Sequence, residues 1–165
     1  QMFLQTDLFY QGQRPAINVG ISVSRVGGSA QTKAMKQVAG SLRLDLASYR
    51  ELQAFTQFGS DLDKATTDQL HRGARMTELL KHGRYAPMPF ETQAFVIYAG
   101  NQGYLDDIPV EDVVRFRDEL RDFTRTARAD VLAHLREEKK WTDAIKAEAN
   151  EAIEAFKKSF APTAQ

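Results

Sequence analysis

Apolar residues recur through most of this chain at the spacing of an α-helix. From Ser29 onward they follow one another in steps of three and four residues, which places them on one face of a helix. The pattern predicts one long helix from Ser29 to about Gln57, ended by Gly59. The residues that carry this pattern are Met35, Val38, Leu42, Leu46, Tyr49, Leu52 and Phe55.

Capping residues mark the boundaries of the helices that follow. Ser60 or Asp61 can cap a second helix that runs through Leu80 and closes at Gly83. Short polar side chains accept hydrogen bonds from the first free amides, and glycine suits the last turn. After a connection that contains two prolines, the apolar segment 90–100 predicts a shorter helix.

The last third of the chain predicts two more helical segments. Pro109 and the two carboxylates that follow it favour a helix start, because proline fits the first turn and acidic groups suit the positive end of the helix dipole. The apolar stripe of this helix continues through a bend at 124–127. Thr142 can cap a final helix, and we expect the tail 161–165 to be loose. The predicted buried face of the final helix is Ile145, Ala149, Ile153, Phe156 and Phe160.

The first 28 residues follow a different pattern. Residues 15–28 alternate apolar and polar side chains, which is typical of a strand, and the pair Gly27 and Gly28 lets the backbone turn at its end. The apolar run 8–10 extends this β pattern toward the N-terminus. The predicted fold class is therefore mainly α, a helical bundle preceded by a short β-strand lead-in.

Composition excludes several classes of protein. The 165 residues contain 22 Lys and Arg against 22 Asp and Glu, so the formal charge is zero and there is no electrostatic footprint for nucleic acid. There is no cysteine, which rules out disulfides and thiolate metal sites. No apolar run approaches the ~20 residues that span a bilayer, so we expect no direct membrane insertion.

Few residues suggest chemistry on their own. Asp61 and Asp63 form a D-x-D pair, but helix capping explains them better because no third ligand is nearby. We interpret the segment 136–140 as solvated charge and Trp141 as a packing residue at a helix junction. Three histidines lack the spacing of zinc ligands: His71, His82 and His134.

Three sequence blocks resemble one protein family. The block RPAINVGISVSRVGG (14–28) joins a Pro-small-aliphatic-Asn run to a Ser-x-Ser, and QFGSDLD (57–63) and VIYAGNQGYLD (96–106) follow it. Together they are similar to the α subunits of F-type ATP synthases over residues 3 to about 160. The catalytic β subunits depart from the pattern around VSRVG.

The resemblance implies that the chain is a piece of a longer subunit. Residues 1–28 would be the end of a nucleotide-binding domain, residues 29–160 the C-terminal helical domain, and 161–165 a flexible tail. The sequence has no Gly-Lys dipeptide and no G-x-G-x-x-G, so it lacks a P-loop to cradle phosphates. We therefore expect the fragment alone to be inactive and to need no cofactor.

Arg25 is the predicted catalytic contributor. A guanidinium is permanently charged and rich in donors, so it suits a phosphate oxygen, although by its position alone Arg25 is also a plain surface charge at the end of a strand. The resemblance implies an arginine finger that reaches the catalytic site of a neighbouring β subunit.

Four further residues match the border of an adenine pocket in the family's non-catalytic site. Arg14 and Pro15 fit this position, but a turn and strand start explains them equally well. Where many members carry two glutamines around a glycine, this chain has His82 and Arg84 around Gly83. That departure puts direct amide hydrogen bonding in doubt, and His82 also suits the dipole at a helix C-terminus.

The resemblance also implies an assembly. Three α and three β subunits would alternate around a central γ subunit, with a δ subunit or peripheral stalk, and the complex would bind Mg-ATP and Mg-ADP. It would lie on the cytoplasmic face of the bacterial plasma membrane or its organellar equivalent, as a peripheral complex coupling proton transport to ATP synthesis or hydrolysis. The alternative is a helical adapter without energy coupling, and a nucleic-acid module is disfavoured by the zero charge.

The isolated N-terminal strands raise a structural question. Residues 1–27 would lack the sheet in which they normally pair, and unpaired strand edges recruit partners. We therefore expect a local hairpin, or a homo-oligomer formed through these strands.

Overall fold

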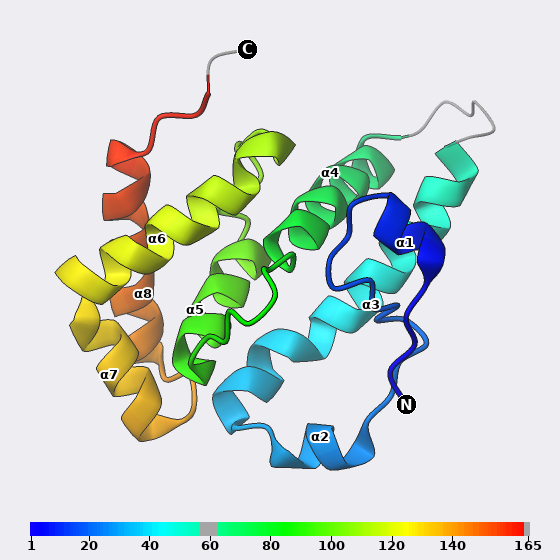
Figure 1. Cartoon of the computed structure of the whole chain (residues 1–165). Helices are drawn as coiled ribbons and strands as arrows, with labels where there is room; N and C mark the ends of the chain where they lie inside the picture. Colours follow the sequence, from blue (N-terminus) through cyan, green and yellow to red (C-terminus); the bar gives the residue numbers. More distant parts are fainter. Residues whose placement is uncertain (57–62, 164–165) are drawn as a thin grey trace.

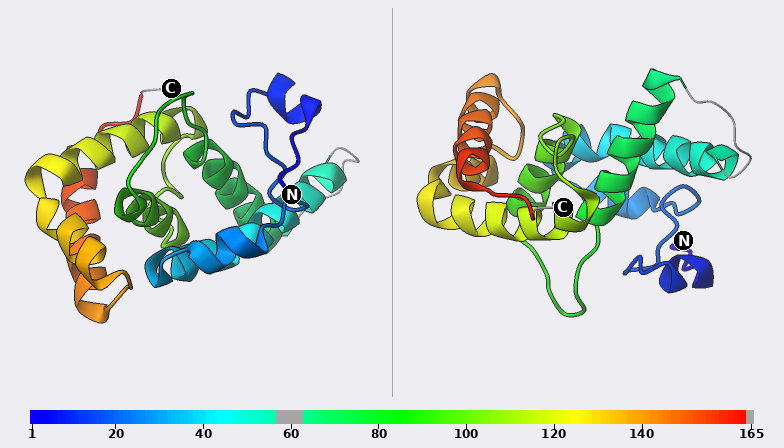
Figure 2. Two further views of the ribbon diagram at one scale, coloured as in Figure 1. Left: turned by 60° about the horizontal axis from the view of Figure 1, so that its bottom comes forward. Right: turned by 90° about the horizontal axis from the view of Figure 1, so that it is seen from above.

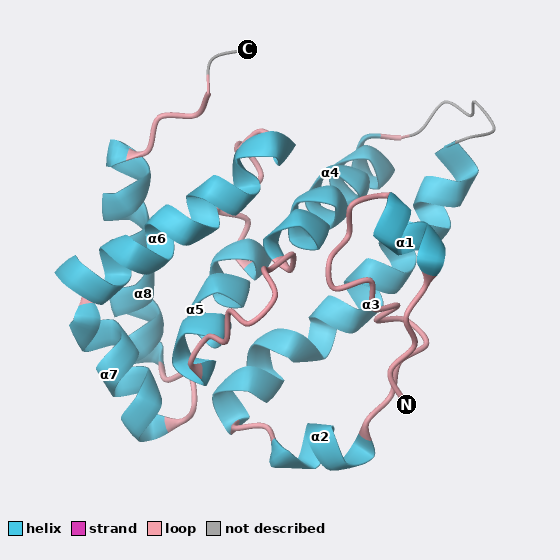
Figure 3. Ribbon diagram, in the orientation of Figure 1, coloured by secondary structure: helices cyan, strands magenta, loops and turns pink. Residues whose placement is uncertain are grey.

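The computed structural model describes residues 1–56 and 63–163, and helices dominate this part of the chain (Figure 1, Figure 3). This confirms the prediction of a mainly α bundle. A 3-10 helix, η1 (Val110–Asp112), precedes α6. The α-helices are α1 (Thr6–Tyr10), α2 (Arg25–Ala30), α3 (Lys33–Thr56), α4 (Lys64–Leu79), α5 (Phe90–Asn101), α6 (Val113–Ala127), α7 (Ala129–Glu138) and α8 (Asp143–Ser159).

Helix α5 is the central element of the bundle. It packs against α3, α4, α6 and α7, which surround it in the views of Figure 1 and Figure 2. Nearly every residue from Glu91 to Gly100 is buried, so this helix has no solvent-facing polar stripe. A helix that is apolar on all sides is typical of a protein core. Its one buried carboxylate, on Glu91, accepts hydrogen bonds from the Arg136 guanidinium of α7, with the Nε to Oε1 distance at 2.9 Å.

Aromatic side chains join α8 to the rest of the bundle. Phe116 of α6 makes edge-to-face contacts with Phe156 and Phe160, each with ring centroids 5.1 Å apart. Trp141 is buried and stacks on Tyr98 of α5 at 4.3 Å, which confirms its predicted role at a helix junction. The predicted inner face of α8 is buried in full.

Side-chain caps begin several of the helices. The Thr142 hydroxyl accepts a hydrogen bond from the Ile145 amide at 3.2 Å, as predicted. Asp63 caps α4 by accepting from the Thr66 amide at 2.9 Å. The expected caps Ser60 and Asp61, the helix stop at Gly59 and most of the block 57–63 lie outside the described residues.

The prediction that Gly83 closes α4 is wrong, because the helix ends at Leu79 with Leu80 as its C-cap. The buried guanidinium of Arg117 on α6 donates to the carbonyls of Leu79, at 3.3 Å, and Lys81. Leu79 carries one of the last helical carbonyls, which have no partner within the helix, and Lys81 follows the helix end. A guanidinium from α6 thus helps to satisfy the carbonyls where α4 ends.

The predicted strand at 15–28 is also wrong. In the described residues, the pairing consists of one antiparallel bridge between Leu4 and Ile17, flanked by two backbone hydrogen bonds of 3.0 and 2.9 Å, and of two hydrogen bonds between Gln1 and Val23. The apolar run 8–10 lies in α1, and residues 25–30 form α2. A strand needs a neighbour along its length, and here the amides of residues 20–22 bond back to Asn18 instead of to a neighbouring strand. The expected hairpin is therefore reduced to two isolated points of pairing, at Ile17 and at Val23.

The long predicted helix is interrupted near its start. Thr32 accepts a hydrogen bond from the Met35 amide at 3.3 Å and so begins α3, while α2 lies before the break. The expected domain boundary between residues 28 and 29 falls within α2.

The tail is held rather than loose at residues 161–163. The Asp112 carboxylate accepts hydrogen bonds from the Thr163 amide and hydroxyl, both at 2.7 Å, and the Ala161 carbonyl accepts one from Arg115 at 2.7 Å. The hydrogen bonds from Thr163, aided by the charge of Arg115, lower the pKa of Asp112. Sequence reasoning missed this clasp because its partners lie 51 positions apart.

The clasp predicts a pH dependence of stability. Because the pKa of Asp112 is lower in the folded state, its contribution is complete above the unfolded value of about 3.9 and disappears as the pH falls through the folded value. We expect Asp112→Asn to be less stable than the parent at pH 7, with the difference closing toward pH 2. Urea unfolding at several pH values measures this. Glu111→Gln, an exposed neighbour, serves as the control, and a difference that stays constant with pH would contradict the prediction.

Substitution by alanine is expected to change the stability in opposite directions at two glycines. A Cβ on Gly73 of α4 would collide with the Tyr49 side chain of α3, whereas one on Gly40 meets nothing within 4 Å. We expect Gly73→Ala to destabilise the bundle by about 1–3 kcal/mol through overpacking. Gly40→Ala should stabilise it by about 0.5–1 kcal/mol by restricting the unfolded chain. Thermal unfolding of both variants checks the signs.

Candidate functional site

The four predicted pocket residues converge on one open groove of about 1110 Å³. Arg14 and Pro15 contribute one wall, which is built from residues 4–16. His82 and Arg84 contribute the other, in the loop that follows α4. The His82 amide donates to the Arg14 carbonyl at 3.0 Å, so a backbone hydrogen bond joins the two walls.

Two guanidinium groups in the groove lie over aromatic rings. The Arg14 guanidinium lies 4.3 Å from the centroid of the Phe9 ring, and that of Arg84 lies 4.7 Å from the Tyr85 ring. Tyr85 is 86% exposed and has a φ of 58°, in the left-handed region. Sequence reasoning missed both rings, although the adjacent Arg84-Tyr85 pair was a visible signal. Such flat cationic and aromatic surfaces can stack on a planar ring.

The groove presents donors rather than negative charge. No carboxylate is among its described lining residues. Arg84 donates one hydrogen bond, from Nη2 to the Tyr85 hydroxyl at 2.8 Å. His82 lies three residues beyond the end of α4, and its Nδ1 faces the Gly83 carbonyl at 3.1 Å rather than the last carbonyls of the helix. The groove therefore suits a flat, electron-rich ring with hydrogen-bond acceptors.

Arg25 lies outside this groove, as the first residue of α2. Ser24 caps this short helix by accepting from the Gly27 amide at 2.9 Å. All six residues of α2 are exposed, and Figure 1 shows the helix at the margin of the bundle. Within the part of the chain that the structure describes, the Arg25 guanidinium makes no hydrogen bond or ion pair. It is free to reach a group on another molecule.

Asn18 organises the loop that leads to α2. Its Oδ1 accepts hydrogen bonds from the Gly20 amide at 3.1 Å, the Ile21 amide at 3.4 Å and the guanidinium of Arg50 on α3. Its Nδ2 donates to Gln5 at 2.9 Å. Burial lowers the pKa of Arg50. One amide thus ties the N-terminal segment to the bundle, a role that its place in the sequence pattern did not reveal.

The hydrogen bonds of Asn18 predict that its loss affects mainly the segment around it. Asn18→Ala removes several hydrogen bonds, each worth about 1 kcal/mol. We expect amide exchange across residues 15–24 to accelerate about fivefold or more, which hydrogen-exchange mass spectrometry measures. Asn150→Ala, which removes the acceptor for the Tyr98 hydroxyl at 3.0 Å, should leave that segment unchanged. Equal acceleration in both variants would show a global effect instead.

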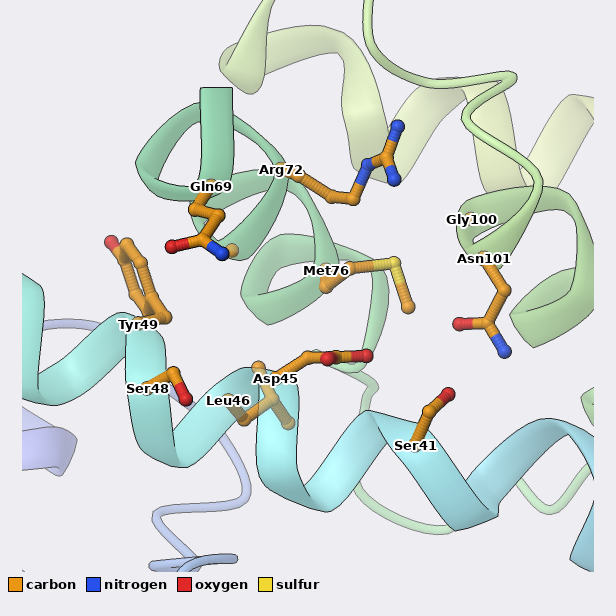
Figure 4. A pocket seen from close by; sticks show the side chains of 11 residues that line it. Ser41, Asp45, Leu46, Ser48, Tyr49, Gln69, Arg72, Met76, Gly100 and Asn101 are labelled. Carbon is orange, nitrogen blue, oxygen red and sulfur yellow. The ribbon is translucent and has the colours of Figure 1, made fainter. Parts of the chain in front are cut away.

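A second cavity of about 250 Å³ lies between α3, α4 and α5 (Figure 4). Asp45 and Tyr49 line its α3 side, and Arg72 and Gln69 its α4 side. Arg72 is bonded to Asp106, and this hydrogen bond raises the pKa of Arg72. Burial raises the pKa of Tyr49, with the charge of Glu78 as the smaller cause. No predicted site residue lines this cavity.

The weaker candidates have structural explanations. Asp63 is a helix cap, and the described residues contain no cluster of acidic or histidine side chains that could hold a metal ion. His134 pairs with Glu148 at 2.8 Å, and this hydrogen bond raises the pKa of His134. None of the helices described here is both long and apolar enough to cross a bilayer.

Comparison with known proteins identifies the family. Residues 31–156 match the model of the ATP synthase alpha/beta chain, C terminal domain. The chain belongs to this family. The matched residues take in α3 to α8 almost completely, so the helical bundle is the family's C-terminal domain. Arg14, Pro15 and Arg25 precede the matched segment, whereas His82 and Arg84 lie within it.

Individual ATP synthase relatives match nearly the whole chain. It is 58% identical over 163 residues to the ATP synthase subunit alpha of two Mycobacterium leprae strains, Br4923 and TN. It is 56% identical over 162 residues to the subunit alpha of Aquifex aeolicus strain VF5. These alignments cover 99% and 98% of the chain, but only 29% and 32% of the relatives. The chain thus spans about three tenths of their length.

Proposed function

We propose that this chain is part of the α subunit of a proton-translocating F-type ATP synthase and forms its C-terminal helical domain. The observation that carries the proposal is 58% identity to ATP synthase α subunits over 163 residues, which includes the N-terminal segment as well as the bundle. The subunit would alternate with β subunits around a rotating γ subunit, with a δ subunit or peripheral stalk attached. The complex would be peripheral to the membrane, on the cytoplasmic face in a bacterium.

Arg25 is the residue that we propose to act in the reaction. Its guanidinium makes no contact within the described chain, and it begins a helix that buries none of its own residues. A six-residue helix without packing is marginal by itself, which favours a partner surface over α2 in the assembly. We propose that Arg25 reaches the γ-phosphate region of Mg-ATP in the neighbouring β subunit. There its charge would stabilise the transferring phosphoryl group.

The groove is the proposed border of the subunit's own nucleotide site. Its stacked ring and guanidinium pairs fit a purine base. The sequence has no P-loop, so the phosphates and magnesium would be held by residues outside this chain. The groove residues would position the base, and the fragment alone would not hydrolyse ATP.

The mechanical role follows from how the helices connect. Arg117 fixes the end of α4 to α6, and α6 packs on α7 and α8. A displacement of the nucleotide-binding part would therefore move the bundle as one body. We propose that this rigid coupling transmits interface closure toward the central stalk.

Substitution of Arg25 tests the finger. In the assembled complex, Arg25→Ala should lower ATP synthesis and hydrolysis by about 10³-fold or more, since arginine fingers contribute about 10³ to 10⁵. Arg25→Lys should recover only part of the rate, because it keeps the charge but not the planar fork. Rates are measured in membrane vesicles, with complex assembly checked in parallel.

Arg125→Ala is the matched control, because this arginine is also exposed but lies on α6. It should retain near-parental synthesis. If Arg25→Ala also retained it, the finger would be excluded, and the chain would be a helical adapter without energy coupling.

A further inference from the structure

We infer that the groove accepts 6-oxopurine nucleotides, those of guanine or hypoxanthine, at least as well as adenine nucleotides, and that Arg84 sets this preference. The inference rests on the proposed function, in which the groove holds the base of a nucleotide. It concerns a property that the family comparison does not give, because it depends on the side chains that this chain places at 82 and 84.

Stacking explains binding of a ring but not the choice of base. A guanidinium covers one face of Tyr85 and one face of Phe9, and any purine can stack on the guanidinium or on the other face of the ring. Discrimination must come from hydrogen bonds at the edge of the ring. The polar atoms of the groove therefore decide the base.

Arg84 offers a donor fork at the groove. Of its five N–H donors, the structure assigns one to a hydrogen bond, from Nη2 to the Tyr85 hydroxyl at 2.8 Å. The residue is exposed, and its ring partner holds the guanidinium at the groove wall. The remaining N–H groups are available to a ligand.

Acceptors are scarcer among the described lining residues. No carboxylate is present, and the Oε1 of Gln5 already accepts a hydrogen bond from Asn18 at 2.9 Å. The Nδ1 of His82 faces the Gly83 carbonyl, which fixes the proton on that nitrogen and leaves Nε2 as an acceptor when the ring is neutral. The groove thus combines a donor fork with an imidazole acceptor and with the hydroxyls of Thr6, Tyr10 and Tyr85, which can either donate or accept.

A 6-oxopurine complements this set of groups. Its O6 and N7 are adjacent acceptors, which a guanidinium reads with two parallel hydrogen bonds. Its N1–H is a donor for the imidazole. Adenine instead carries an amino donor at position 6, and this donor would face a second donor in the fork. Side-chain amides, by contrast, pair with N6 and N7 of adenine.

Comparison of three nucleotides tests the inference. The full-length subunit that contains this chain is titrated with Mg-ATP, Mg-ITP and Mg-GTP by calorimetry. All three share the same triphosphate, so affinity ratios cancel the phosphate contacts. Mg-ITP differs from Mg-ATP at position 6 and in the proton on N1. We expect the parental subunit to bind Mg-ITP and Mg-GTP at least as tightly as Mg-ATP.

The Arg84→Gln variant should reverse this order. Replacement of the fork by an amide is expected to shift the ATP-to-ITP affinity ratio toward ATP by roughly 5- to 100-fold. Arg84→Lys is the matched control, because it keeps the positive charge at this position but lacks the fork. It should weaken discrimination without favouring ATP.

Two sets of results would overturn the inference, and they show whether the role of Arg84 or the role of the whole groove is wrong. If parent and Arg84→Gln both prefer Mg-ATP by the same ratio, while Tyr85→Ala weakens all three nucleotides equally, the groove holds the base and the inference about Arg84 is overturned. If Arg84→Gln, His82→Ala and Tyr85→Ala all leave the three affinities unchanged, the base lies elsewhere. In that case the proposed role of the groove fails together with the inference.

Discussion

Burial of α5 on nearly all sides is the constraint on which the bundle depends. Four helices pack against it, so each must present a complementary apolar face. Close approach requires a small residue at the crossing, because a Cβ on Gly100 would collide with Met76 of α4. The same burial requires a partner for the carboxylate of Glu91, and Arg136 supplies it from α7. An unpaired buried charge there would cost several kcal/mol, on the order of 3–5.

Local signals in the sequence predicted the helices well. Thr142 caps α8 through an amide three residues away, and the inner face of that helix repeats at the helical period. Such information is contained within one or two turns. Two of the features that sequence reasoning got wrong depend on distant partners. The strand at 15–28 required neighbours along its length, and the clasp between Asp112 and Thr163 closes across the bundle.

The candidate site was predicted unevenly. Arg14, Pro15, His82 and Arg84 were chosen through a family resemblance, and the structure brings them to one groove. The rings of Phe9 and Tyr85 were missed, because an aromatic residue near an arginine is common and acquires meaning only when the two stack. Arg25 was singled out by the same resemblance. Its surroundings could not be predicted, since the residue was expected at the end of a strand and lies at the start of α2.

Arg117 gives the groove a mechanical property. Its guanidinium anchors the last turn of α4 from inside the bundle, only a few residues before His82. The opposite wall belongs to the N-terminal segment, which Asn18 ties to α3 through Arg50. The two walls are therefore mounted on different helices and meet at the bond between His82 and Arg14. A shift of the N-terminal segment relative to the bundle would therefore widen or narrow the gap between the two walls, while the bundle itself stays rigid.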